Sequence, residues 1–193
     1  MLQSERTPPV DAVRIIESYY PPGTLAYEIL MTHSRQVTQK AIDIARGVPN
    51  LNPDIDFIRE AAMLHDIGIF QTHAPDIGCT GNAPYICHGY LGRELLERLG
   101  YPRHGLVCER HTGTGLSVSD IKTNNLPLPA REMVPISLEE EIICFADKFF
   151  SKNPDNYMEE TPIGDIVAML RRFGPHTVDR FLAWAEKFRM PVP

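Results

Sequence analysis

The sequence predicts an all-α protein, and three observations lead to that fold class. Apolar residues recur at helical spacing in one segment after another, and residues that favour helix N-caps precede several of these segments. Neither strands in series nor an internal repeat is found. The length of 193 residues lies within the usual range of about 50–250 for one domain, so we expect a single helical bundle over residues 1–193.

The expected helices can be placed in order from their caps and breakers. Pro21-Pro22-Gly23 ends the first helix, Thr24 can cap the second, Asp54 can cap the third, and Gly68 is expected to end the third. Later in the chain, Ser137-Leu138-Glu139-Glu140 resembles a capping box. The helices predicted in this way cover residues 10–20, 24–47, 54–68, 88–99, 102–111, 137–149, 161–173 and 175–189.

Two stretches between these helices are expected to be irregular, residues 71–87 and 113–136. The first is rich in Pro, Gly and Asn, which favour turns. Long ordered loops inside a compact domain often serve a functional site. We therefore expect both stretches to shape a pocket.

The composition limits the classes of function. Nineteen Lys and Arg against 25 Asp and Glu give a net charge of −6, so no global basic field favours DNA or long RNA as a partner. The four cysteines have no C-x-x-C pairing and are too few for a disulfide scaffold, which favours reduced thiols. No signal peptide or transmembrane stretch is predicted, so we expect a cytoplasmic protein that does not bind membranes.

Aromatic and aliphatic residues near the C-terminus allow two interpretations. The last predicted helix carries Phe181, Leu182, Trp184 and Phe188. These side chains could support a homodimer as an exposed apolar face, or they could close the core of the bundle.

The pair His65-Asp66 is the first sign of a functional site, because it stands late in an apolar segment. A buried polar group without a partner costs roughly 1–3 kcal/mol, and an unpaired charge costs far more. A divalent metal ion would satisfy both side chains. The sequence therefore predicts a metal site at this pair.

Other His and Asp residues fall at inward-facing or helix-end positions of four further helices. The complete candidate ligand set is His33, His65, Asp66, His88, His111 and Asp147. Four imidazoles and two carboxylates suit Fe, Mn, Co, Ni or Zn better than Mg or Ca, which favour oxygen ligands. Six ligands could hold two ions, and Asp66 could bridge them by giving one oxygen to each.

One alternative ligand is left open. His104 precedes His111 by seven residues, which is about two helical turns, so both lie on one helix face. His104 is therefore the rival for the second ion, although its place at a helix start is also typical of a solvated cap residue. His73 and His176 are expected at the surface.

His33, the His65-Asp66 pair and the distant Asp147 follow the pattern of the HD-domain metal-dependent phosphohydrolases, which the chain resembles over roughly residues 25–152. The segment His65-Asp66-Ile67-Gly68 has the form that names the HDIG subset. The C-terminal helices, residues 161–189, would then pack on this metal-binding core.

His88 and His111, between the pair and the last Asp, are similar to the additional ligands of the binuclear branches. The resemblance implies one ion at His33, His65, Asp66 and Asp147, and a second ion at Asp66, His88 and His111. Ile69 stands where many HDIG proteins carry Lys, and the Gly-Tyr-Pro signature of the cyclic-dinucleotide branch is absent, which disfavours cyclic di-GMP.

The resemblance implies a hydrolase for a small phosphomonoester or phosphodiester, such as a nucleotide, with attack by metal-bound hydroxide. Asp66 would hold the nucleophile, while Arg35 and Lys148, close in sequence to candidate ligands, would stabilise the phosphate charge. Two alternatives remain: a mixed-valent di-iron oxygenase with a similar ligand set, and a metal-binding sensor or interaction module without turnover.

Overall fold

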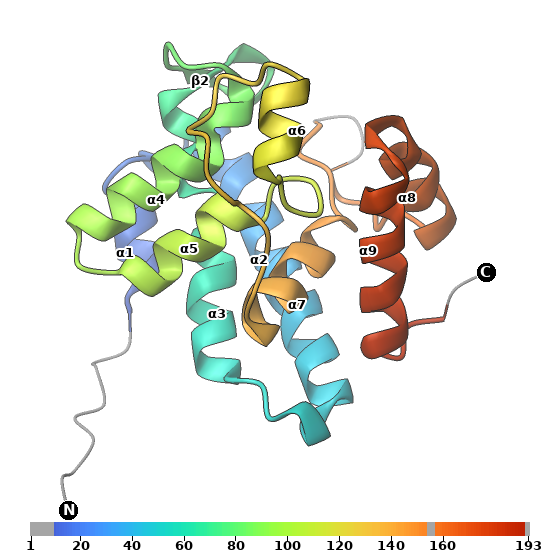
Figure 1. Cartoon of the computed structure of the whole chain (residues 1–193). Coiled ribbons are helices and arrows are strands. Elements are labelled where there is room, and N and C mark those ends of the chain that lie inside the picture. Colours follow the sequence, from blue (N-terminus) through green and yellow to red (C-terminus); the bar gives the residue numbers. More distant parts are fainter. Residues whose placement is uncertain (1–9, 154–156, 192–193) are drawn as a thin grey trace, which may run out of the picture.

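Helices make up most of residues 10–153 and 157–191, which this computed structural model describes (Figure 1). The all-α prediction is confirmed. The α-helices are α1 (Ala12–Glu17), α2 (Leu25–Gly47), α3 (Ile55–Leu64), α4 (His88–Arg98), α5 (Pro102–Arg110), α6 (Val118–Thr123), α7 (Leu138–Asp147), α8 (Ile163–Leu170) and α9 (Pro175–Lys187). Shorter elements are the 3-10 segments η1 (Pro49–Leu51), η2 (Ile67–Gln71), η3 (Pro75–Ile77), η4 (Tyr85–Cys87) and η5 (Arg171–Phe173), and the antiparallel strands β1 (His73–Ala74) and β2 (Cys79–Thr80).

Side chains cap the three helices that carry the centre of the fold. The Thr24 hydroxyl accepts the Tyr27 N–H at the start of α2, and the Asp54 carboxylate accepts the Phe57 N–H at the start of α3. The Ser137 hydroxyl likewise accepts a backbone N–H at the start of α7. The N-caps predicted at these positions are confirmed. Each side chain accepts a backbone N–H of the first turn, which has no partner within the helix itself.

The third helix ends earlier than predicted. Its last α-helical residue is Leu64, and Gly68 lies in η2 rather than at a helix cap. A Cβ atom at Gly68 would lie 2.2 Å from the His88 carbonyl oxygen and 2.5 Å from the Gly92 nitrogen. The glycine is required because the backbones of η2 and α4 approach closely, and this approach brings Asp66 to the first turn of α4.

The stretch 113–136 contains more regular structure than predicted. The Ser117 hydroxyl accepts the Asp120 N–H, and the Asp120 carboxylate accepts the Ser117 N–H, so the two residues form a capping box at the start of α6. The pattern Ser-x-x-Asp is the sequence signal that would have placed this helix.

The larger of two apolar clusters packs α2, α3, α7 and α9 together. Phe145 of α7 stacks on Phe181 of α9 with ring centroids 4.7 Å apart, and Phe188 meets Phe145 edge-on at 5.4 Å. Helix α9 thus lies against α7 and α8 packs on α9, on the opposite side of the molecule from α1 and α4 (Figure 1). Phe181, Trp184 and Phe188 are buried within the chain, so these three close the core instead of forming an exposed dimer face.

The smaller cluster joins α1, α2, α4 and η2. The buried Tyr20 hydroxyl donates to the Ile67 carbonyl at 3.0 Å and accepts the Phe70 N–H at 2.8 Å. These two hydrogen bonds fix η2 directly after the His65-Asp66 pair. The centre of the fold therefore holds that pair between two packed apolar regions.

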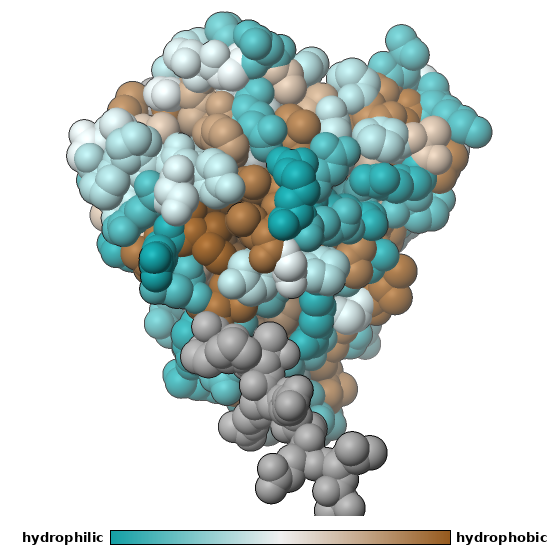
Figure 2. Space-filling view, turned by 90° about the vertical axis from the view of Figure 1, so that its left-hand side faces the viewer, coloured by the Kyte–Doolittle hydropathy of each residue, from teal (hydrophilic) through white to brown (hydrophobic). Residues whose placement is uncertain are grey.

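Apolar side chains also gather on the face that carries α1 and α4 (Figure 2). A groove beside α1, α3 and the start of α5 has Val13, Phe57, Met63 and Tyr101 among its lining residues. None of the six candidate ligands lines this groove. Among the described residues, no helix is both long enough and apolar enough to cross a membrane, and residues 1–9, where no signal peptide is predicted, lie outside the described chain.

Candidate metal centre

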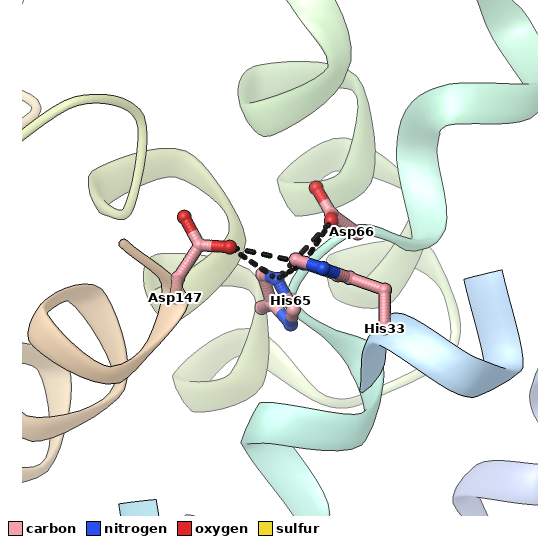
Figure 3. Close-up of side chains that lie close together, drawn as sticks. All are labelled: His33, His65, Asp66 and Asp147. Atoms are coloured by element: carbon pink, nitrogen blue, oxygen red, sulfur yellow. Dashed lines mark hydrogen bonds and ion pairs between the residues drawn. The ribbon is translucent and has the colours of Figure 1, made fainter. Parts of the chain in front are cut away.

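Four candidate ligands converge where α2, the end of α3 and the end of α7 meet (Figure 3). His33 Nε2 lies 3.2 Å from Asp66 Oδ2 and 3.0 Å from Asp147 Oδ1. His65 Nε2 lies 3.1 Å from Asp66 Oδ2 and 3.4 Å from Asp147 Oδ1. Each residue offers one ligand atom, all within 4.8 Å of one another, which is a spacing that one ion can span.

A second group shares Asp66 with the first. His88 Nε2 lies 3.4 Å and His111 Nε2 lies 3.3 Å from Asp66 Oδ1, and the two Nε2 atoms are 3.1 Å apart. Asp66 therefore turns Oδ2 to the first group and Oδ1 to the second. A carboxylate in this orientation offers one oxygen to each group.

The backbone fixes the tautomer of three imidazoles. Nδ1 of His65, His88 and His111 lies 2.6–2.7 Å from the carbonyl oxygen of the residue three positions earlier. A carbonyl only accepts, so each Nδ1 carries the proton and each Nε2 of the neutral ring presents a lone pair. Metal-binding histidines are typically oriented by such a bond at the other ring nitrogen.

The second group then contains three acceptors and no donor of its own. Burial lowers the pKa of His88 to about 3, and burial also lowers the pKa of His111, so both rings are neutral. Asp66 Oδ1, the oxygen that faces both imidazoles, is buried and accepts no hydrogen bond from the described residues. Two nitrogen lone pairs and a carboxylate oxygen repel one another at these distances unless a cation lies between them.

The first group also favours a positive charge. Burial alone would raise the pKa of Asp66, but Lys152 and His65 hold the pKa well below its usual value. Burial likewise opposes a charge on His65, yet Asp66 and Asp147 raise its pKa to about 9. The two carboxylates thus attract a cation to His65 Nε2, and a divalent ion meets this requirement as well as a proton does. The donor set fits divalent metal ions in both groups.

Two lysines border the candidate ligands. Lys148 Nζ lies 2.7 Å from Asp147 Oδ2 and donates to the His111 carbonyl at 3.3 Å, so it connects the ends of α7 and α5. Lys152 Nζ lies 2.7 Å from Asp66 Oδ2 and 3.9 Å from Asp147 Oδ1. Sequence reasoning missed Lys152 because it follows the end of α7, where helical periodicity no longer gives a direction.

The structure does not bring Arg35 to this centre. Arg35 is exposed, whereas His33 on the same helix is fully buried. Two residues along an α-helix correspond to a rotation of about 200°, so these side chains point to opposite sides. The sequence prediction used distance along the chain and ignored this rotation.

His104 lies outside both groups. Its Nε2 is 3.2 Å from Glu60 Oε2, and its ring meets Phe57 edge-on at 4.9 Å. It shares a helix face with His111, but seven residues also separate them by about 10 Å along the axis. His104 is buried rather than solvated as a cap, whereas His73 and His176 are exposed as expected.

Comparison with known proteins identifies the family. The HD domain matches residues 30–151, which contain all six candidate ligands. The chain belongs to the HD domain family. This membership, together with the two His/Asp groups, supports binding of divalent metal by an HD-type centre.

Curated relatives add no established chemistry. An uncharacterised protein of Methanocaldococcus jannaschii is 32% identical over 126 residues, which cover 64% of this chain and 67% of that protein. Proteins named tRNA (cytidine(56)-2'-O)-methyltransferase from Thermoplasma volcanium and Picrophilus torridus are 31% and 29% identical over 127 residues. These 127 residues cover 65% of this chain and 33% of either methyltransferase. No solved structure matches the chain significantly.

Proposed function

We propose that the HD domain formed by this chain is a metal-dependent phosphohydrolase for a small phosphomonoester or phosphodiester, with nucleotides as the first class to test. One divalent ion would bind His33, His65, Asp66 and Asp147, and the other would bind Asp66, His88 and His111. Fe, Mn, Co, Ni and Zn suit this mixed nitrogen and oxygen set better than Mg.

The observation that carries the proposal is the second group. His88, His111 and Asp66 direct two lone pairs and a carboxylate oxygen at one point, at separations of 3.1–3.4 Å. A site for a single ion would not need these two imidazoles. A pair of ions about 3.5–4 Å apart is the arrangement that many phosphatases and nucleases use.

Each residue then has a defined task. When bound, two divalent ions would neutralise phosphate oxygens and activate a water molecule for attack. Asp66 would set the distance between the two ions, because it would give one carboxylate oxygen to each of them. Lys148 holds the Asp147 carboxylate and the carbonyl of His111, and so keeps ligands of α7 and α5 at a fixed separation. The buried imidazoles exclude bulk water from the centre.

Two other functions are compatible with the same ligands. A di-iron oxygenase would use iron and consume oxygen, and a sensor module would bind metal without turnover. Methyl transfer is not proposed, because two thirds of each methyltransferase named above lies outside the aligned residues.

The test begins with metal content, by inductively coupled plasma mass spectrometry of protein purified without added metal. Phosphate release from nucleotides and from p-nitrophenyl esters is then measured without oxygen, with Asp66→Ala and the exposed Asp165→Ala as a matched pair. We expect about two ions per chain, turnover in the native protein and in Asp165→Ala, and no turnover in Asp66→Ala.

Three results would contradict the proposal. The first is full activity of Asp66→Ala. The second is retained iron with oxygen uptake that depends on substrate and no phosphate release, which would identify an oxygenase. The third is two bound ions with no turnover of any phosphate ester, which would favour the sensor module.

A further inference from the structure

Lys152 and Tyr85 approach the metal centre from two segments that are far apart in the sequence. Lys152 follows α7, and its Nζ contacts Asp66 Oδ2 at 2.7 Å. Tyr85 belongs to η4, its hydroxyl lies close to the Lys152 side chain, and the centroid of its ring lies 4.9 Å from that of His88. The ammonium group thus contacts the Asp66 carboxylate and lies near a phenol.

We propose that Lys152, oriented by Tyr85, binds the anionic phosphate group of the substrate beside the two ions. This inference rests on the proposed function and names the residue that recognises the substrate charge. Neither Lys152 nor Tyr85 belongs to the candidate ligand set.

The charges of the centre balance without metal ions. Asp66 and Asp147 carry two negative charges, and Lys148 and Lys152 pair with them. Two divalent ions would add four positive charges among the same oxygens, so an ammonium beside Asp66 would then be repelled. Lys152 needs a new anion close by, and a phosphate oxygen at the ions supplies it.

Lys152 and Tyr85 are more exposed than the ligands at the centre. The side chains of His33, His65 and Asp66 have no exposed surface, whereas the Lys152 side chain is 16% exposed and Tyr85 is 39% exposed. Lys152 contacts Asp66 and is itself partly exposed, so its side chain reaches from a buried ligand toward the surface. A substrate phosphate that approaches the ions beside Asp66 would contact its ammonium group.

The chemistry of Lys152 and Tyr85 also suits an anion. A lysine acts as a flexible point charge with three donors, so its ammonium can leave Asp66 Oδ2 and still reach an oxygen bound nearby. The Tyr85 hydroxyl, which lies close to the Lys152 side chain, limits this movement. The pair therefore suits a small dianion better than an uncharged substrate.

The experiment is calorimetric titration of inorganic phosphate into the full chain loaded with Mn²⁺, with metal content measured in each sample. We expect Lys152→Met to weaken phosphate binding by about 10- to 100-fold, as loss of a hydrogen bond from a charged group does, with metal content unchanged. Lys152→Arg should retain part of the affinity, and Tyr85→Phe should lose a smaller part. Lys122→Met, at an exposed lysine of α6, is the matched control and should bind phosphate normally.

Separate outcomes distinguish failure of this inference from failure of the proposed function. Equal phosphate affinity of Lys152→Met and native protein overturns the inference alone. Loss of metal from Lys152→Met also overturns it, because Lys152 would then support the ligands instead of the substrate. If native protein with two ions binds no phosphate, the inference and the proposed function both fall.

Discussion

The Nε2 atoms of His88 and His111 face each other at 3.1 Å while each Nδ1 is bonded to a backbone carbonyl. Such a contact between two neutral imidazoles is repulsive because neither Nε2 carries a hydrogen. The two rings come from the start of α4 and the residue after α5, so the fold itself holds this contact in place. A bound cation would convert the repulsion into two coordinate bonds.

His111→Ala should therefore lower the metal content from about two ions per chain to about one, while the group at His33 keeps its ion. The matched control is His104→Ala, at a residue of α5 that lies seven positions before His111 and contacts Glu60 instead of Asp66. Mass spectrometry of metals in both proteins checks this. Equal metal content in the two variants would show that His111 is not a ligand.

Metal binding should stabilise the fold, because the ligands come from five separate segments. A ligand at 100 times its dissociation constant stabilises a protein by about 2.7 kcal/mol. For a chain of this length, that corresponds to a rise in Tm of roughly 5–10 °C. Differential scanning calorimetry with Mn²⁺ and with EDTA measures the shift. The same Tm in both solutions would argue against metal sites in the folded chain.

Gly68→Ala should destabilise the protein by about 3 kcal/mol, as severe overpacking does, because the new Cβ would clash with backbone atoms of α4. The expected loss in Tm is roughly 6–12 °C. Gly47→Ala is the control, because no other segment lies within 4 Å of the position that its new methyl group would take. This control should change stability by less than about 0.5 kcal/mol. Urea unfolding of both variants checks the prediction, and equal stability would refute the close approach of η2 and α4.

The four cysteines should resist thiol reagents in the folded protein. Burial raises the pKa of all four thiols, and it raises that of Cys144 to about 12. At pH 8 a thiol with a pKa of 12 is ionised in about one molecule in ten thousand, and the thiolate is the reactive form. Ellman's reagent should label no cysteine before unfolding and four cysteines in guanidinium chloride. Rapid labelling of folded protein would contradict the burial.

Much of the fold follows from local sequence signals. Thr24, Asp54 and Ser137 are N-caps as predicted, because capping depends on residues only three positions apart. The ends of helices are less predictable. Gly68 has the residue type of a helix C-cap, yet its role depends on the His88 backbone, twenty residues away in the chain.

In the candidate site, too, some features follow from the sequence and others depend on how the helices pack. Helical periodicity and residue chemistry selected six candidates and left His104 as a rival of one of them, His111. The structure brings together His33, His65, Asp66, His88, His111 and Asp147. Periodicity gives the direction of a side chain around one helix axis. Periodicity does not say how far along the helix a side chain lies relative to other helices, or which residues of those helices it contacts.

Residue types and their spacing were enough to establish the helical class, the main caps and the set of imidazoles and carboxylates that suits divalent ions. The packing of the helices was needed to show that His111 rather than His104 faces Asp66, that Arg35 points outward and that Lys152 points inward. Packing also assigns one oxygen of Asp66 to each group. The reason is physical: these relationships are distances between separate helices, and the contacts within the apolar clusters set those distances.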